Sequence, residues 1–261
     1  MRLIHCACGT DTLIHGAEHH LLPPVPSRRD LKFLDEIARE VLPVDPTPSL
    51  QEIAASPNVS HLGEPAPAPQ QPDERLRVIV SGSDAALSAV LTRMMRGDYL
   101  WAEVAYVPDY ASSPAAMLWG VSEHARNLAV SGPVRPIPCI RNDAGLVVAG
   151  SATLTHADGA PYIGEIVVDN EILVCSDGRG RQLGARLVPT AHAPGIAAAA
   201  IRKKRFQSRT VVDGTCTPSG RALQSGGESI LVTVDSVPAK RPVERVTFYR
   251  HLRDIQAVRS T

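Results

Sequence analysis

Apolar and polar positions are most regular in the stretch that follows residue 75. An apolar run of strand length is followed by small turn residues, and apolar side chains then recur at helical spacing up to Gly97. The predicted elements are a strand at 76–80, a turn at 81–83, a helix over 87–95, a strand at 102–107 ending at Pro108, and a helix opened by Ser113-Pro114. This order predicts a parallel βαβ unit with a right-handed crossover.

The residues before this unit show a helical pattern and then a proline-rich stretch. Ser27 and Asp30 have the spacing of a capping box, and residues 31–42 carry an apolar face at helical spacing that Pro43 ends. Eight prolines lie from Pro43 to Pro72, and the stretch at 63–72 has no hydrophobic period. Because proline fixes φ and removes an amide donor, this stretch predicts an extended linker.

From residue 133 onward, short apolar runs are separated by Gly, Asp, Asn or Pro at spacings typical of an antiparallel, sandwich-like layer. The expected strands lie at 146–149, 153–155, 163–168, 172–175, 183–188, 211–212, 230–234 and 245–249. The Ala-rich stretch Ile196–Ile201 is interpreted as a helical turn. The sequence therefore predicts an α/β lobe plus an all-β sandwich-like lobe. The predicted organisation is an N-terminal helical segment (1–62), a Pro-rich linker (63–75), a small α/β lobe (76–132) and a β-rich lobe (133–261).

Composition narrows the class of protein. With 44% apolar and 21% charged residues, the chain is not wholly disordered, and no apolar run has the length of a membrane span. Five cysteines, an odd and sparse set, favour a reducing cytoplasmic location over a disulfide framework. The chain has few aromatic residues, so nucleic-acid binding by base stacking is not favoured.

Charge is unevenly distributed although the total is zero. Residues 1–75 carry −5, residues 76–200 carry −2 and residues 201–261 carry +7. The basic C-terminal part could contact phosphate on a nucleotide or a lipid head group, or the acidic N-terminal part of the same chain.

The turn at 82–87 is the main chemical signal. Small residues between a strand and a helix let backbone N–H groups approach a phosphate, and the helix N-terminus adds partial positive charge. Gly82, Ser83, Ala85 and Ala86 are therefore candidate phosphate-binding residues, and a purely structural strand–helix turn is the alternative. The lysine and second glycine of a Walker loop are absent.

A family resemblance follows from three motifs. The stretch V-I-V-S-G-S-D-A-A-L-S-A-V-L at 78–91 resembles the strand–G-G-D-G-T-L–helix signature of the diacylglycerol kinase and NAD kinase superfamily. Val107-Pro108 and Ala111-Ser112-Ser113 stand where that superfamily has P-x-G-T-x-N-D, and residues 234–238 resemble its D-G-E turn. The resemblance covers residues 76–250 and implies the same two-lobe architecture.

The resemblance also implies site residues and a ligand. Asp84 would orient a metal–nucleotide complex, namely ATP with magnesium, and Asp235 would lie near the acceptor. Ser112 and Ser113 would join the nucleotide-binding residues. Several family residues are replaced here: Ser83 and Ala85 stand for glycines, Ala86 for threonine, and Val237 for the carboxylate of D-G-E. An N-P-x-S-G strand–turn is not evident in the N-terminal part, which implies that part of the nucleotide lobe is absent or replaced.

A second cluster has metal-ligating atoms. Cys6 and Cys8 are followed by His15, His19 and His20, but C-x-C is not the C-x-x-C spacing of a zinc module. Ordinary packed cysteines and surface histidines are the favoured interpretation.

Three hypotheses of function result. The first is a degenerate kinase-like protein, which binds a nucleotide or phosphorylated ligand without efficient turnover. The second is an active ATP-dependent lipid kinase. The third is a non-enzymatic interaction or assembly protein that forms homo-oligomers through its β lobe.

Overall fold

Five parallel strands form the sheet of the first lobe. The computed structural model describes residues 1–44, 55, 63–121, 124–204 and 210–260. The order in this sheet is β16-β4-β3-β1-β2. The strands are β1 (Arg2–Cys8), β2 (Glu18–Leu22), β3 (Leu76–Gly82), β4 (Glu103–Pro108) and β16 (Gln256–Val258). Every residue of β3 is buried, as expected for a central parallel strand covered on both faces.

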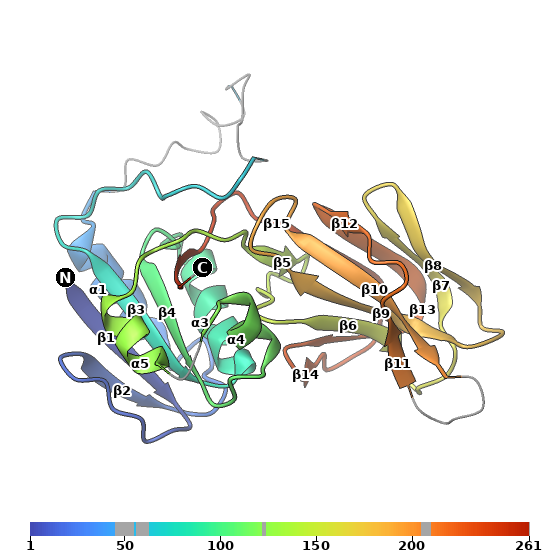
Figure 1. Ribbon diagram of the computed structural model, residues 1–261, viewed down its shortest axis with the longest axis horizontal. Helices are drawn as coiled ribbons and strands as arrows, with labels where there is room; N and C mark the ends of the chain where they lie inside the picture. The colour runs from blue at the N-terminus through green and yellow to red at the C-terminus, as the bar shows by residue number, and fades with distance from the viewer. Residues whose placement is uncertain (45–54, 56–62, 122–123, 205–209, 261) are drawn as a thin grey trace.

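Helices cover both faces of this sheet (Figure 1). The helices are α1 (Lys32–Val41), α3 (Asp84–Arg96), α4 (Pro114–Leu118) and α5 (Ala125–Ser131). The first three pack on one face, against side chains such as Val78 and Val104. Ala129 of α5 and Ile14 pack on the other face, against Ile79 and Ala105. Even- and odd-numbered residues of each strand therefore enter different cores, because successive side chains point to opposite faces.

Three strands of this sheet come from outside the range expected for the α/β lobe. The N-terminal part, expected to be helical, contributes β1 and β2 as well as α1, and β1 hydrogen-bonds directly to β3. At the other end of the chain, β16 returns from the β lobe to pair with β4. The first lobe therefore takes residues from both of the flanking ranges that the sequence assigned elsewhere.

The second lobe is a curled antiparallel sheet of eleven strands. The 13-residue strand β13 lies at its centre and pairs with β6, β7, β14 and β15. The strands are β5 (Ile140–Asn142), β6 (Ala152–His156), β7 (Ile163–Val168), β8 (Glu171–Asp177), β9 (Gln182–Pro189), β10 (Ile196–Lys203), β11 (Thr210–Asp213), β12 (Ser219–Gly220), β13 (Ala222–Val234), β14 (Val237–Pro238) and β15 (Val243–Arg250). The expected division into an α/β lobe and an all-β lobe is confirmed.

One expectation in this lobe was wrong. The Ala-rich stretch Ile196–Ile201 is not a helical turn, because it forms most of β10 and pairs along its length with β9. Alanine favours helices intrinsically, but pairing with β9, β11 and β12 and burial of Ala198 and Ala200 in the lobe core override that preference.

The two lobes are joined by two crossing segments that run antiparallel to each other. Isolated bridges link Ile137 with Ile255 and Val134 with Val258, and the Arg135 N–H donates to Ala257 O at 2.7 Å. Helix α3 adds contacts between the lobes, since the Ser88 hydroxyl donates to Val147 O at 2.6 Å.

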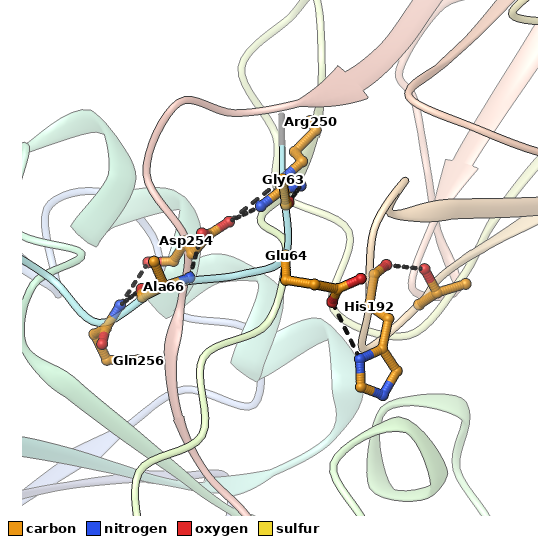
Figure 2. Close-up of polar contacts among 8 residues, drawn as sticks. Gly63, Glu64, Ala66, His192, Arg250, Asp254 and Gln256 are labelled. Atoms are coloured by element: carbon orange, nitrogen blue, oxygen red, sulfur yellow. Dashed lines mark hydrogen bonds and ion pairs between the residues drawn. The ribbon is translucent and has the colours of Figure 1, made fainter. Parts of the chain in front are cut away.

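A third segment, residues 63–70, lies along this junction and is called the strap below. It forms no helix or strand, as predicted for the linker, yet it is hydrogen-bonded to the C-terminal crossing. Figure 2 shows Ala66 N–H donating to Asp254, Gln256 donating back to Ala66 O, and Arg250 donating to Gly63 O. Glu64 reaches His192 of the β lobe at 3.3 Å.

Candidate functional site

The candidate phosphate-binding turn joins the end of β3 to the start of α3. Gly82 has a φ of +140°, and a side chain there would place Cβ 2.7 Å from Cys8 O, so only glycine fits. Ser83 is the N-cap of α3, and its hydroxyl oxygen accepts the Ala86 N–H at 3.3 Å. One amide of the expected anion cradle is therefore bonded to a side chain of the turn itself.

Asp84 is held by donors from two neighbouring elements. Its Oδ1 accepts the Tyr106 hydroxyl at 2.9 Å and the Ser113 hydroxyl at 2.6 Å, and its Oδ2 accepts the Ala115 N–H at 3.1 Å. Ser113 also caps α4, because its oxygen accepts the Ala116 N–H at 3.2 Å. The Asp84 carboxylate thus stabilises the start of α4 and the position of Tyr106.

Asp235 occupies the turn between β13 and β14, the late turn on which it was expected. Asp235 and Ser236 have φ values of +47° and +68°, as a tight hairpin turn requires. The buried carboxylate accepts the N–H groups of Ala149, Gly150 and Ser151, each at 2.8 Å. Burial raises the pKa of Asp235 to about 7, against the lowering effect of these three amide donors.

The structure brings Asp84 and Asp235 together across the junction of the lobes. Gly150 lies between them: its N–H donates to Asp235, and a Cβ at position 150 would lie 2.7 Å from Asp84 Oδ2. The negative charge of Asp84 contributes to the raised pKa of Asp235. Two acids that are far apart in the sequence therefore lie on either side of one glycine.

The remaining expected residues surround this pair unevenly. Gly82, Ala85 and Ala86 are buried in the strand–helix connection, whereas Ser112 is exposed one residue before the α4 cap. Sequence reasoning missed Tyr106 and Gly150. A tyrosine on a strand that ends beside the turn was the available signal for Tyr106, and Gly150 had none beyond its small size.

The arrangement of Asp84 and Asp235 offers few free carboxylate oxygens to a magnesium ion. Mg²⁺ needs carboxylate oxygens that are free to face it with near-octahedral geometry. Both oxygens of Asp84 and both of Asp235 already accept hydrogen bonds from the protein. Among the residues that the structure describes, no group of three His, Cys, Asp or Glu side chains is placed to hold a metal ion.

The sheet separates Cys6 and Cys8 from His5 and His19, whereas His20 stacks on Phe33 of α1 on the cysteine side. Cys6 and Cys8 are buried in the core beneath α1 and α3, whereas His5 projects from the opposite face of β1. There His5 bonds to Ser81 at 2.7 Å and to His19 at 2.8 Å, and burial lowers the pKa of His5 to about 4. Cys6 and Cys8 are therefore packed core residues, as in the favoured interpretation.

The carboxyl ends of the parallel strands lie at the same edge of the sheet as the turn. Strand order reverses between β1 and β3, and ligands of open α/β sheets bind at such a switch point. After β1 the chain turns at Gly9, whose φ is +67°. A strand–turn therefore exists at the place where the resemblance suggested that part of the lobe was absent or replaced, although its residues do not match N-P-x-S-G.

A polar cavity of about 620 Å³ opens at this end of the sheet. Asp109, whose N–H donates to Gly82 O at 3.0 Å, connects it to the turn. Thr12 and Asp109 line it from the sheet side, and His124, Arg126 and Asn127 line it from α5. Its volume lies in the range typical of small-molecule sites.

Comparisons with known proteins give the fold and not the chemistry. No protein-family model matches the chain, and no curated protein matches its sequence. A diacylglycerol kinase structure from Bacillus anthracis str. Sterne matches with a TM-score of 0.59 and 9% identity, over 99% of this chain and 97% of that one. A second structure, also described as a diacylglycerol kinase of that organism, gives 0.61 and 9% over the same shares. An NAD kinase from Archaeoglobus fulgidus in complex with ATP gives 0.48 and 14%, over 97% and 92%. The chain has the two-lobe fold of the two diacylglycerol kinases, as the resemblance implied.

Proposed function

We propose that the protein binds a nucleotide or another phosphorylated ligand at the carboxyl ends of its parallel strands and does not transfer a phosphoryl group efficiently. The polar cavity supports binding, because Arg126 and His124 place cationic or hydrogen-bonding groups beside an opening of ligand size. None of the described helices is long and apolar enough to cross a membrane.

The proposal that turnover is inefficient rests on one observation, the hydrogen bonds that Asp84 accepts. Phosphoryl transfer depends on positioning and on neutralising charge around the phosphates. A carboxylate that already accepts from Tyr106, Ser113 and Ala115 is poorly available to orient a metal–nucleotide complex. Asp84 therefore acts as a structural anchor in this chain.

Calorimetry tests the binding part of the proposal. We expect heat on titration with ATP, and a several-fold weaker affinity for Arg126→Glu because a carboxylate would repel phosphate. Arg179→Glu is the matched control, since Arg179 is 91% exposed on the β lobe and far from the cavity lining. The absence of heat at millimolar ATP would contradict binding and, with self-association in light scattering, would favour the assembly hypothesis.

A transfer assay tests the catalytic part. We expect no transfer of γ-phosphate label from ATP–magnesium to diacylglycerol in mixed micelles, or to NAD, above a protein-free blank. Transfer that is lost in Asp84→Asn would instead establish an active kinase. The observation that favours this alternative is the pKa of Asp235, which at about 7 suits a general base at neutral pH.

A further inference from the structure

A second cavity, of about 370 Å³, lies between α3 and the β lobe. Its walls come from one side of α3, from the segment around residues 25–31 and from β13, β14 and β15. Its wall includes Ala85 and Val234, the neighbours of Asp84 and Asp235, but neither acid lines it. It is therefore a site distinct from the polar cavity at the strand ends.

Apolar side chains gather at this cavity. Among the described residues, four of the large hydrophobic side chains that remain exposed line it: Val25, Leu146, Val237 and Val243. Their exposed fractions lie between 39% and 47%. Exposed apolar side chains that gather around one cavity indicate a binding site, whereas single exposed apolar side chains do not.

The polar groups in the wall of the cavity are already satisfied by the protein. The Ser88 hydroxyl donates to Val147 O, Thr92 Oγ1 accepts the Val147 N–H at 2.9 Å, and Asn142 Oδ1 accepts the Leu146 N–H at 2.8 Å. Arg93 pairs with Asp35, and Arg96 donates to Ala144 O and Gly145 O. A ligand inside therefore finds van der Waals contact but few hydrogen-bond partners, which suits an alkyl chain and not a nucleobase.

Two guanidinium groups remain at the edge. Arg28 and Arg245 line the cavity and are both exposed, and within the described residues neither guanidinium group has a hydrogen-bonding or ion-pair partner. Asp143 also lines the cavity, and its carboxylate accepts the Thr247 N–H at 3.2 Å. Guanidinium groups bind carboxylates and phosphates through paired hydrogen bonds.

We propose that this cavity binds a single-chain anionic amphiphile of the fatty-acid class, with its alkyl chain against Leu146, Val237 and Val243 and its carboxylate at Arg28 and Arg245. This site is separate from the proposed nucleotide site, so the loss of one leaves the other intact. The alkyl chain contacts the apolar side chains of the wall, and the negative head group pairs with the positive charges of Arg28 and Arg245.

Calorimetric titration with dodecanoate, dodecanol and dodecylamine tests the proposal on the full chain. We expect dodecanoate to bind about tenfold more tightly than dodecylamine, because the cationic head group is repelled at the edge. Arg28→Gln together with Arg245→Gln should weaken dodecanoate binding several-fold, and Arg221→Gln, an exposed change outside the lining, should leave it unchanged. Equal affinities for the three probes would overturn the assignment of an anionic ligand.

A filling variant tests the location. Val237→Trp places a large ring over the cavity from an exposed strand position, where aromatic residues are tolerated, and should abolish dodecanoate binding. Val212→Trp, at a position 48% exposed on β11 away from the lining, is the matched control. Both variants should keep the wild-type affinity for ATP, which separates this test from that of the nucleotide site. Undiminished dodecanoate binding by Val237→Trp would place the amphiphile elsewhere and overturn the proposal.

Discussion

At the scale of single residues, the carboxylate of Asp84 connects three elements that are separated in the sequence. It starts α3, accepts a hydroxyl from β4 and receives an amide from the first turn of α4. Removing it would leave the Ala115 N–H and the Ser113 hydroxyl without their acceptor, whereas the Tyr106 hydroxyl would keep Gly82 O at 3.0 Å. Unsatisfied groups of this kind cost free energy in proportion to their burial.

We therefore expect Asp84→Ala to lower the free energy of unfolding by about 2–3 kcal/mol. Asp158→Ala is the control: Asp158 is exposed in the turn after β6, and its replacement should change stability by less than about 0.5 kcal/mol. Urea denaturation monitored by tryptophan fluorescence measures both. Equal stabilities of the two variants would contradict the anchoring role of Asp84.

Asp235 gives a second prediction at this scale, because its pKa of about 7 lies above the ordinary value of 3.8. Between about pH 4 and pH 7, the folded protein keeps a proton on the Asp235 carboxyl group, whereas the unfolded chain has already released it. The contribution of Asp235 to stability is therefore complete below pH 4 and is lost as the pH rises to about 7.

The carboxyl ¹³C resonance of Asp235, assigned by its disappearance in Asp235→Asn, should titrate with a midpoint near 7. The decline in free energy of unfolding between pH 4.5 and pH 7.5 should be smaller for that variant than for the wild type. A midpoint below 4 would mean that the three amide donors outweigh burial.

The sequence predicted part of this site because some roles are local. Ser113 caps α4, as its place before Pro114 predicts, whereas Ser83, a predicted phosphate-binding residue, caps α3. The contacts of Tyr106 and Gly150 depend on how β4, α4 and the β lobe come together. The hydrophobic periodicity of the sequence does not predict such contacts between elements.

At the scale of elements, the side chain of Arg77 links an ion pair with Glu103 to the C-terminal end of α5. The buried Arg77 guanidinium donates to Glu103 at 2.7 Å and also to the carbonyl oxygens of Ala129, Val130 and Gly132 at the end of α5. A cation there satisfies carbonyl groups that the helix leaves unpaired and opposes the negative end of its dipole.

Arg75 and Arg77 contact the same carboxylate with different burial, which allows a matched comparison. The Arg77 side chain is 2% exposed and that of Arg75 is 62% exposed. We expect Arg77→Met to lower the free energy of unfolding by about 3–5 kcal/mol, because Glu103 would lose its buried partner. Arg75→Met should cost less than about 1 kcal/mol. Comparable losses in urea denaturation would show that burial does not decide the value of this pair.

Element prediction succeeded where apolar period and helix caps agreed, and failed where tertiary pairing decided. The strand at 76–80 and the helix over 87–95 lie inside β3 and α3, and the strand at 102–107 coincides with β4 except for one residue at each end. Residues 2–8 carry no predicted strand, yet pairing with β2 and β3 makes them the strand β1. The short β16 has three residues and becomes a strand only through β4.

At the scale of the whole molecule, the strap fixes the junction of the lobes with a simple sequence pattern. Prolines alternate with alanines from Pro65 to Pro69, so backbone donors remain only at every second residue. Ala66 and Ala68 direct those donors to Asp254 and Gln256. Both N–H groups that lie between the prolines of this stretch therefore have an acceptor.

We expect Gln256→Ala to release the strap while the lobes stay folded. Ala68 N–H and Ala66 O would lose their partner, and hydrogen exchange at Ala66 and Ala68 should accelerate about tenfold. Gln224→Ala, at an exposed position on β13, is the control and should leave this exchange unchanged. Exchange by mass spectrometry reports the strap cleanly, because its prolines carry no amide hydrogen. If Ala66 and Ala68 exchange in the wild type as fast as in an unstructured peptide, the strap does not hold the junction, and the two crossing segments and α3 set the position of the lobes without it.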